Sequence, residues 1–302
     1  MRILLVLLAS TLIGACAGRK DERTKCVEAA LEFPALSEGV AVFDDMSGQV
    51  VEARSGYWIS RNGHSPMMMA SLTKPLVAQE VRRRVSSEEL SLNQSIGDVL
   101  AIPDLSRETK VVTIQQLLQH RGGFDRHVVD PLFATASSSC HSAVAEVLSR
   151  KPDYLPGTAT IYSNSGYCVL GEILMQSVSS TPLDATLEAA LKSQLGAAGG
   201  WVGSLQDLHA ALKKGFPLVE LEPSPTLPDG SHYAYGWRSW PSSPVHARWT
   251  HFGRLPGMVS IALTDGKDAL LVAHFLGNPL DVEATSEELG QRLWLCMVAS
   301  RQ

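Results

Sequence analysis

The order of sequence patterns predicts an α/β protein of the α+β kind, in which an antiparallel β-sheet is flanked by helices and carries an inserted all-helical lobe. Three observations lead to this fold class. Strand-like runs lie near the start of the chain, helix-like runs fill its middle, and further strand-like runs precede a closing helix. A sheet made from both ends of the chain would leave a cleft against the helical lobe.

The first part of the predicted domain combines a helix, a hairpin and the start of the helical lobe. Residues 26–33 are helix-like, and residues 39–43 and 50–54 alternate as two strands around a turn. The apolar spacing then changes to a helical period in four runs, which cover residues 75–85, 112–123, 142–150 and 166–178.

The last part returns to strands. Four β-rich runs separated by proline, glycine and aspartate cover residues 233–240, 248–253, 258–266 and 268–277, and a final helix is expected at 286–299. We therefore expect one domain at 26–302. Its sheet lobe should comprise about residues 26–80 and 200–302, and its helical lobe about residues 81–199.

Composition limits the possible partners. The 302 residues are 45% hydrophobic and 19% charged, enough to bury one large core or two modest ones, and the net charge is -5. No basic run or aromatic-basic stripe stands out, which argues against a nucleic-acid partner. A small, uncharged or mildly polar substrate fits this composition.

The first residues predict export. Arg2 precedes an apolar run from Ile3 to Ile13 that is too short for a membrane anchor. The sequence Ile13-Gly14-Ala15-Cys16 resembles a bacterial lipobox, which implies a signal peptide at 1–15, a lipid on Cys16, a spacer at 16–25 and a membrane-anchored protein of the bacterial cell envelope facing the periplasm. The alternative is cleavage after Ala17, which would release a soluble protein.

An exported chain meets an oxidising compartment, so its remaining cysteines are disulfide candidates. Four cysteines allow three pairings. We favour Cys26 with Cys296, which lie in apolar helix-like stretches at the two ends, and Cys140 with Cys168, which flank a middle segment. Cys140, His141 and His127 lack the paired spacings of a zinc site, so no metal is expected. His120, His127 and His141 are interpreted as polar residues of the helical lobe.

The stretch Met69-Ala-Ser-Leu-Thr-Lys-Pro75 holds a candidate nucleophile. Positions i and i+3 share a helix face, so Ser71 and Lys74 can come within hydrogen-bonding distance. Proline is tolerated only in the first turn of a helix, so Pro75 places Ser71 near the helix N-terminus. There the amide of the serine could form half of an oxyanion hole. Alone, such a short match also arises by chance.

Two further segments make the match specific. Tyr162-Ser-Asn164 lies in a predicted loop before an apolar helix, and Thr250-His-Phe-Gly-Arg-Leu-Pro-Gly257 follows later. These motifs, in this order after Ser71, resemble the serine β-lactamase and penicillin-binding protein superfamily, specifically its class C-like branch. That branch includes β-lactamases, D-alanyl-D-alanine carboxypeptidases, D-amino-acid peptidases and esterases. The resemblance covers nearly the whole chain after the leader and implies a β-lactamase/transpeptidase-like fold.

The resemblance also implies roles for the matched residues. Ser71 would be acylated and Lys74 would share in its proton transfer. Tyr162 would take the serine proton, directly or through Lys74, and later activate the deacylating water. Asn164 would hold the substrate amide and position Lys74, and His251 would support this proton network.

Two more residues complete the expected site. Gly253 would leave room for substrate at the sheet edge, and the Arg254 amide would complete the oxyanion hole. Phe252 stands where many members have threonine, so Arg254 could take over recognition of a carboxylate. The segment 177–200 is shorter than in the family, which predicts a more open or differently covered pocket.

The sequence thus predicts a cofactor-independent serine hydrolase that acts through acyl-Ser71 on amides or esters with a D-amino-acid-type acyl group. Its substrate would be a small molecule or a peptidoglycan peptide. Two alternatives stay open: a small-ester esterase using the same residues, and a non-catalytic penicillin-binding or other binding protein of the envelope.

Overall fold

The computed structural model describes residues 20–56, 61–100, 102, 105–124, 130, 132–222 and 225–299. The predicted signal peptide, Cys16 and His127 lie outside the described residues. Within these ranges, no helix combines the length and the apolar character needed to cross a bilayer.

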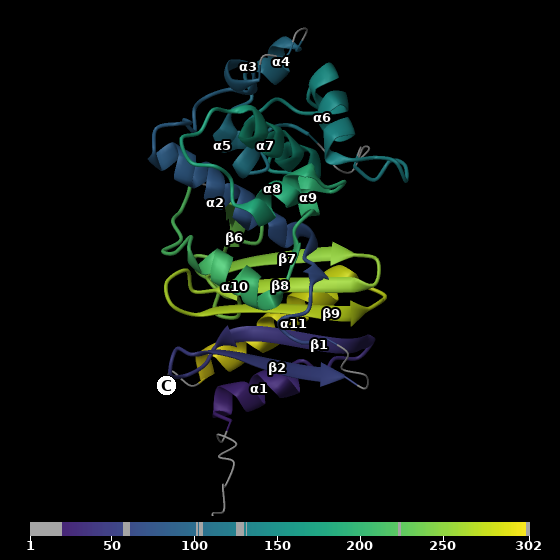
Figure 1. Ribbon diagram of the computed structural model, residues 1–302, viewed down its shortest axis with the longest axis vertical. Helices are drawn as coiled ribbons and strands as arrows, with labels where there is room; N and C mark the ends of the chain where they lie inside the picture. The colour runs from purple at the N-terminus through teal and green to yellow at the C-terminus, as the bar shows by residue number, and fades with distance from the viewer. Residues whose placement is uncertain are drawn as a thin grey trace, which may run out of the picture.

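The protein is built on a seven-stranded antiparallel sheet of strand order β2-β1-β9-β8-β7-β6-β5, which confirms the predicted fold class. The N-terminal hairpin joins the C-terminal strands through β1, which pairs with β9 (Figure 1). The strands are β1 Leu36–Asp44, β2 Val50–Gly56, β5 His232–Ala234, β6 Trp237–Ser239, β7 Trp249–Leu255, β8 Met258–Thr264 and β9 Leu270–Gly277.

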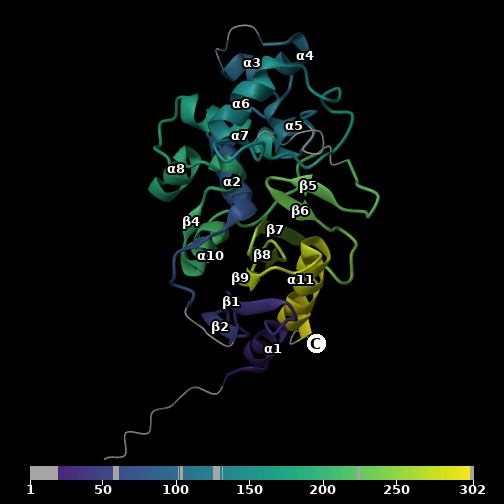
Figure 2. The ribbon, with the colours of Figure 1, turned by 90° about the vertical axis from the view of Figure 1, so that its right-hand side faces the viewer.

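Helices form a lobe above one edge of the sheet, and α2 runs down from this lobe to the strands (Figures 1 and 2). The longer elements of the lobe are α2 Thr73–Ser86, α6 Cys140–Ser149, α7 Asn164–Gln176 and α8 Ala185–Lys192. Shorter helices are α3 Ile96–Val99, α4 Arg107–Lys110, α5 Ile114–Leu118 and α9 Gly196–Gly199, and a small second sheet pairs β3 Met67–Met68 with β4 Val202–Gly203.

Successive side chains of each strand face opposite sides of the sheet, so the strands contribute to two hydrophobic cores. In β1, Val40 and Val42 pack with the helical lobe and α10 Leu205–Lys213, whereas Ala41 and Phe43 pack with α1 Glu22–Ala30 and α11 Val282–Val298. Both faces of the central strands are therefore covered, and every residue of β8 is buried.

Two helices begin earlier than the sequence predicts. Asp21 caps α1 by accepting from the Thr24 amide, and Asp281 caps α11 by accepting from the Ala284 amide. The first turn of α1 is polar, and the first turn of α11 is mixed, with Val282 and Ala284 beside Glu283 and Thr285, so apolar spacing alone missed both starts.

Two disulfides tie the elements together. Cys26 bonds to Cys296 and joins α1 to α11, while Cys140 bonds to Cys168 and joins α6 to α7. These are the two pairings that the sequence favours.

Candidate active site

The nucleophile candidate Ser71 lies in a single 3-10 turn, Ala70–Leu72, directly before α2. Ala70 has φ of 46°, a left-handed conformation that is costly for a residue with a side chain. Hydrogen bonds on both sides maintain this turn. Thr73 Oγ1 donates to the Ala70 carbonyl at 2.8 Å, and Ser260 Oγ donates to the Met69 carbonyl at 2.8 Å. The sheet therefore fixes the backbone from which Ser71 projects.

Lys74 lies in the first turn of α2 and is fully buried. Its Nζ is 2.9 Å from Ser71 Oγ, 2.9 Å from Asn164 Oδ1 and 2.6 Å from the Ala198 carbonyl. The last two partners are oxygens that only accept, so they use two N–H groups of Lys74. The third position of the nitrogen faces Ser71, with a lone pair if the amine is neutral and with an N–H if it is charged.

Asn164 is oriented by a residue that the sequence did not single out. Its Nδ2 donates to Asp130 Oδ2 at 2.8 Å, which directs Oδ1 toward Lys74. Asn164 is the first residue of α7 rather than part of a loop, because Ser163 caps this helix by accepting from the Gly166 amide. Asp130 and Asn164 are 34 positions apart in the chain, and no local sequence pattern predicts their contact.

Tyr162 lies between Lys74 and a buried histidine. The Lys74 Nζ is 5.0 Å from the centroid of the Tyr162 ring, and the His120 ring centroid is 4.4 Å from it. His120 Nδ1 accepts from the Ser163 amide at 3.0 Å, so this histidine fixes the backbone beside Tyr162. The interpretation of His120 as an ordinary polar residue of the helical lobe is therefore incomplete, since it forms the wall behind Tyr162.

His251 lies in β7, with its ring centroid 6.3 Å from that of Tyr162. Burial lowers the pKa of His251 well below its usual value, and the positive charges of Lys74 and Arg254 lower it further. The ring is therefore neutral near pH 7. Among the described residues, nothing hydrogen-bonds to its buried Nε2.

Glycine is required at position 253 for a different reason than the sequence predicts. A Cβ at this position would lie 2.5 Å from the Met69 carbonyl and 2.2 Å from Ser260 Oγ. The missing side chain thus lets the nucleophile turn pack directly on β7, and it does not open space for substrate at the sheet edge.

Arg254 extends toward α11. Its Nε donates to Ser286 Oγ at 3.0 Å, and its guanidinium carbon lies 5.4 Å from the centroid of the Phe252 ring. Burial lowers the pKa of Arg254, and the nearby Glu283, 3.5 Å away, partly offsets this. The side chain stays within the pocket wall, where a carboxylate could still reach it.

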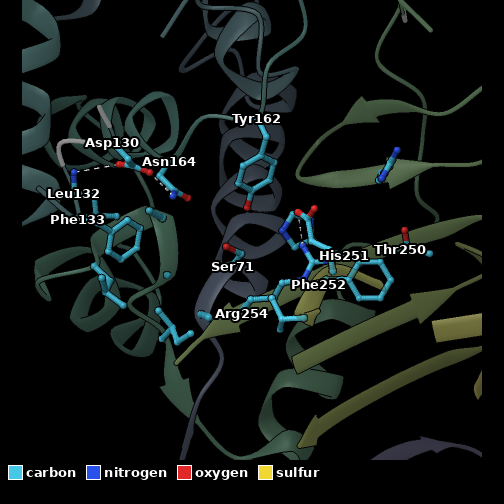
Figure 3. A pocket seen from close by; sticks show the side chains of 18 of the residues that line it. Ser71, Asp130, Leu132, Phe133, Tyr162, Asn164, Thr250, His251, Phe252 and Arg254 are labelled. Carbon is cyan, nitrogen blue, oxygen red and sulfur yellow. Dashed lines mark hydrogen bonds and ion pairs between the residues drawn. The ribbon is translucent and has the colours of Figure 1, made fainter. Parts of the chain in front are cut away.

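These residues surround a pocket of about 590 Å³ (Figure 3). Ser71, Tyr162, Asn164, His251 and Arg254 line it, while Lys74 lies buried beneath. The short segment before residue 200 still supplies a wall, through Leu195, Ala198 and Gly199. Within the described part of the chain, no group of three or more acidic, histidine or cysteine side chains could hold a metal ion.

In this site a serine is hydrogen-bonded to a buried lysine, and a tyrosine and a neutral histidine lie beside them. This is the arrangement of a serine hydrolase. The Beta-lactamase family model matches residues 29–201, more than half of the chain. The protein belongs to this family.

Solved structures share the fold. A D-amino acid amidase from Ochrobactrum anthropi SV3, complexed with L-phenylalanine, has a TM-score of 0.73 and 18% identity, and the match covers 93% of this chain and 100% of that one. An octameric penicillin-binding protein homologue from Pyrococcus abyssi has a TM-score of 0.67 and 17% identity, covering 87% of this chain and 74% of that one.

Curated relatives show higher sequence identity than these solved structures do. A protein of Dichelobacter nodosus, named as fimbrial assembly protein FimD of serogroup D, is 30% identical over 169 residues. The match covers 53% of this chain and only 42% of that protein.

Proposed function

We propose that this protein hydrolyses amides or esters with a D-amino-acid-type acyl group through an acyl-Ser71 intermediate, as in the class C-like branch of its family. The observation that carries the proposal is the fully buried Lys74, whose Nζ lies 2.9 Å from Ser71 Oγ. A lysine is costly to bury, and here its buried nitrogen is directed at a hydroxyl in the pocket. The shared fold of the D-amino acid amidase supports amides as the substrate class.

In the proposed acylation, Ser71 Oγ bonds to the carbonyl carbon and its proton passes to Tyr162, directly or through Lys74. The backbone amides of Ser71 and Arg254 stabilise the oxyanion. As the intermediate collapses, the bond to the leaving nitrogen or oxygen breaks, and the leaving atom takes the proton. Water then attacks acyl-Ser71, Tyr162 accepts a proton of the water, and Ser71 Oγ leaves and is reprotonated.

The proposal includes the location of the protein. We propose that the chain is exported and anchored to the bacterial envelope through a lipid on Cys16, on the strength of the lipobox-like sequence. The two disulfides support an oxidising compartment, because such bonds are rare in the cytosol.

The test uses the mature chain with a fluorescent penicillin, p-nitrophenyl esters, and D- and L-aminoacyl p-nitroanilides. We expect covalent labelling and faster cleavage of the D-anilides, both lost in Ser71→Ala. Ser242→Ala is the matched control, because Ser242 is exposed and lies outside the pocket.

The other outcomes separate the alternatives. Ester turnover without penicillin labelling or anilide cleavage would identify an esterase. Folded protein that neither reacts with nor is labelled by any of these compounds would rule out both enzymes and leave the binding protein.

A further inference from the structure

We propose that the active-site pocket continues into an apolar groove that binds the acyl side chain of the substrate, so that the protein prefers substrates with long or bulky apolar acyl groups. This inference rests on the proposed function, because it assigns a substrate class to the same Ser71 site.

The groove has a volume of about 550 Å³ and is walled on one side by the small β3–β4 sheet, while the polar Thr135, Ser193 and Gln194 also contribute to its lining. Met68 and Val202 lie directly opposite each other in this sheet, and both line the groove. Strand alternation explains why Met68 faces outward. Its neighbours Met67 and Met69 are buried in the core, whereas Met68 is 43% exposed.

The groove and the pocket share a wall. Leu132, Phe133 and Leu195 line both spaces, so the two spaces adjoin along these apolar side chains. Each space lies within the range of about 300–1,000 Å³ that is usual for small-molecule sites. Together they exceed what an alanyl group attached to Ser71 would fill.

The apolar side chains that line the groove are exposed to solvent, which favours a ligand-binding site over a part of the hydrophobic core. Phe133 is 55% exposed and Val202 is 50% exposed, and they lie with Met68 around one hollow. Apolar side chains gathered at one exposed site mark binding surfaces more often than isolated ones do. The pocket differs from the groove in having charged lining residues, among them Arg238, Glu283 and Glu287.

The proposed chemistry decides which part of the substrate enters the groove. The leaving atom takes the proton held by Tyr162, so the leaving group lies on the side of Tyr162 and His251. Figure 3 shows Tyr162 above Ser71, His251 on one side of it, and Leu132 and Phe133 on the other side. The acyl group therefore extends toward Phe133 and the groove.

The test is a series of p-nitrophenyl esters from acetate to octanoate, in which only the acyl group changes. Each kcat/KM is divided by the rate of alkaline hydrolysis of the same ester, which removes differences in intrinsic reactivity. We expect the corrected kcat/KM to rise about threefold for each added methylene until the groove is filled. In Val202→Asp, the octanoate value should fall about tenfold, while the acetate value should stay within about twofold.

The acetate rate of the variant shows that its fold and Ser71 are intact. Val178→Asp is the matched control, because Val178 is 91% exposed and lines neither space, and it should keep the full chain-length dependence. If acetate is hydrolysed but the corrected rates do not rise with chain length, or Val202→Asp leaves the octanoate rate unchanged, the groove is not a subsite and the proposed function stands. If neither an ester nor a D-aminoacyl anilide acylates Ser71, the proposed function fails and the role of the groove in it fails too; if only anilides react, the same acyl series is measured with p-nitroanilides.

Discussion

Among single residues, two buried histidines make the stability of the protein depend on pH. Burial and the neighbouring Arg61 lower the pKa of His274 to about 4, and the pKa of His251 is also lowered. The unfolded chain takes up these protons below about pH 6.5 and the folded chain does not, so stability is lost as the pH falls from 6.5 toward 4.

We therefore expect the free energy of unfolding, measured with urea, to fall between pH 6.5 and pH 4.5. His274 alone would contribute up to about 3 kcal/mol by pH 4, and His274→Gln should flatten the slope. Asp44 loses its contribution only at lower pH, because its pKa is lowered from 3.8. The exposed His64 gives the control His64→Gln, which should keep the slope. Equal slopes in wild type and His274→Gln would contradict the assignment.

The sequence could predict the residues that belong to a recognisable motif. It could not predict the residues that hold those side chains in place. The i, i+3 spacing brings Ser71 and Lys74 together on any helix start. Asp130 and His120 act across 34 and 43 positions, and a contact of that range depends on how the lobes fold. The sequence identified Gly253 but gave the wrong reason, because its close neighbour is backbone from another segment.

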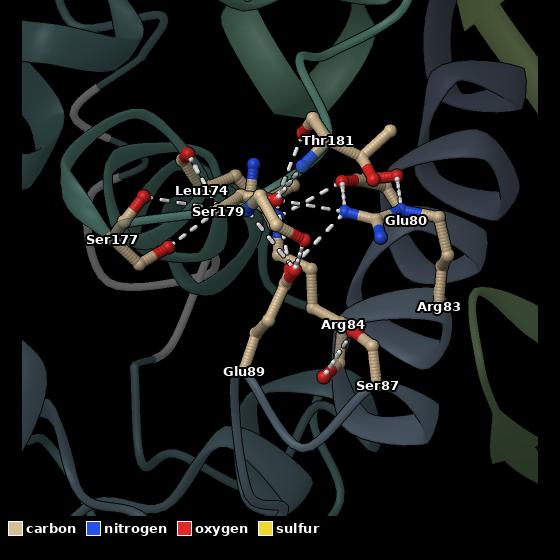
Figure 4. A network of polar contacts seen from close by, with 10 residues as sticks. Glu80, Arg83, Arg84, Ser87, Glu89, Leu174, Ser177, Ser179 and Thr181 are labelled. Carbon is tan, nitrogen blue, oxygen red and sulfur yellow. Dashed lines mark hydrogen bonds and ion pairs between the residues drawn. The ribbon is translucent and has the colours of Figure 1, made fainter.

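Among the elements, α2 and α7 matter most because they carry Lys74 and Asn164 at their first turns. A buried network joins them at their other ends (Figure 4). Arg84 of α2 donates to Glu80 at 2.9 Å, to the Leu174 carbonyl at 3.0 Å and to Ser177 Oγ at 2.6 Å. This network fixes the α2–α7 packing from which the site projects.

Arg84→Met should lower the free energy of unfolding by about 2–3 kcal/mol, because it removes the buried donor to the Leu174 carbonyl while Glu80 keeps its two contacts with Arg83. Arg83→Met is the control. Arg83 belongs to the same network but its side chain is 34% exposed, so its loss should cost about 1 kcal/mol or less. Urea unfolding measures both, and equal losses would show that the network does not depend on the buried arginine.

Periodicity predicted α2, α6, α7 and α11 and the long strands, while it did not predict α8, α10 and the shortest elements. Helices α3 and α4 have four residues each, and β3 and β4 have two, too few to show a period. The β3–β4 pair nevertheless builds the groove wall, so this part of the site was not accessible from sequence patterns.

Across the whole molecule, the two disulfides should have different effects. The Cys26–Cys296 bond links positions 270 residues apart and joins α1 to α11, so the loop that it closes contains the whole inserted helical lobe. The Cys140–Cys168 bond links positions 28 residues apart, and Cys168 lies one turn after Asn164 on α7. The first bond therefore constrains the unfolded chain more, and the second lies nearer the chemistry.

We expect the double variant Cys26→Ala/Cys296→Ala to lose ~2 kcal/mol more free energy of unfolding than Cys140→Ala/Cys168→Ala, because the entropy of closing a loop grows with its length. The shorter-loop variant should instead show the larger fall in kcat for the substrate that Ser71 cleaves, since α7 loses a fixed contact beside Asn164. Urea unfolding and steady-state kinetics measure the two effects on the same samples. With reductant present all three proteins lack both bonds, so the stability difference should disappear. If that difference persists, it comes from packing of the cysteine side chains and not from the loops they close.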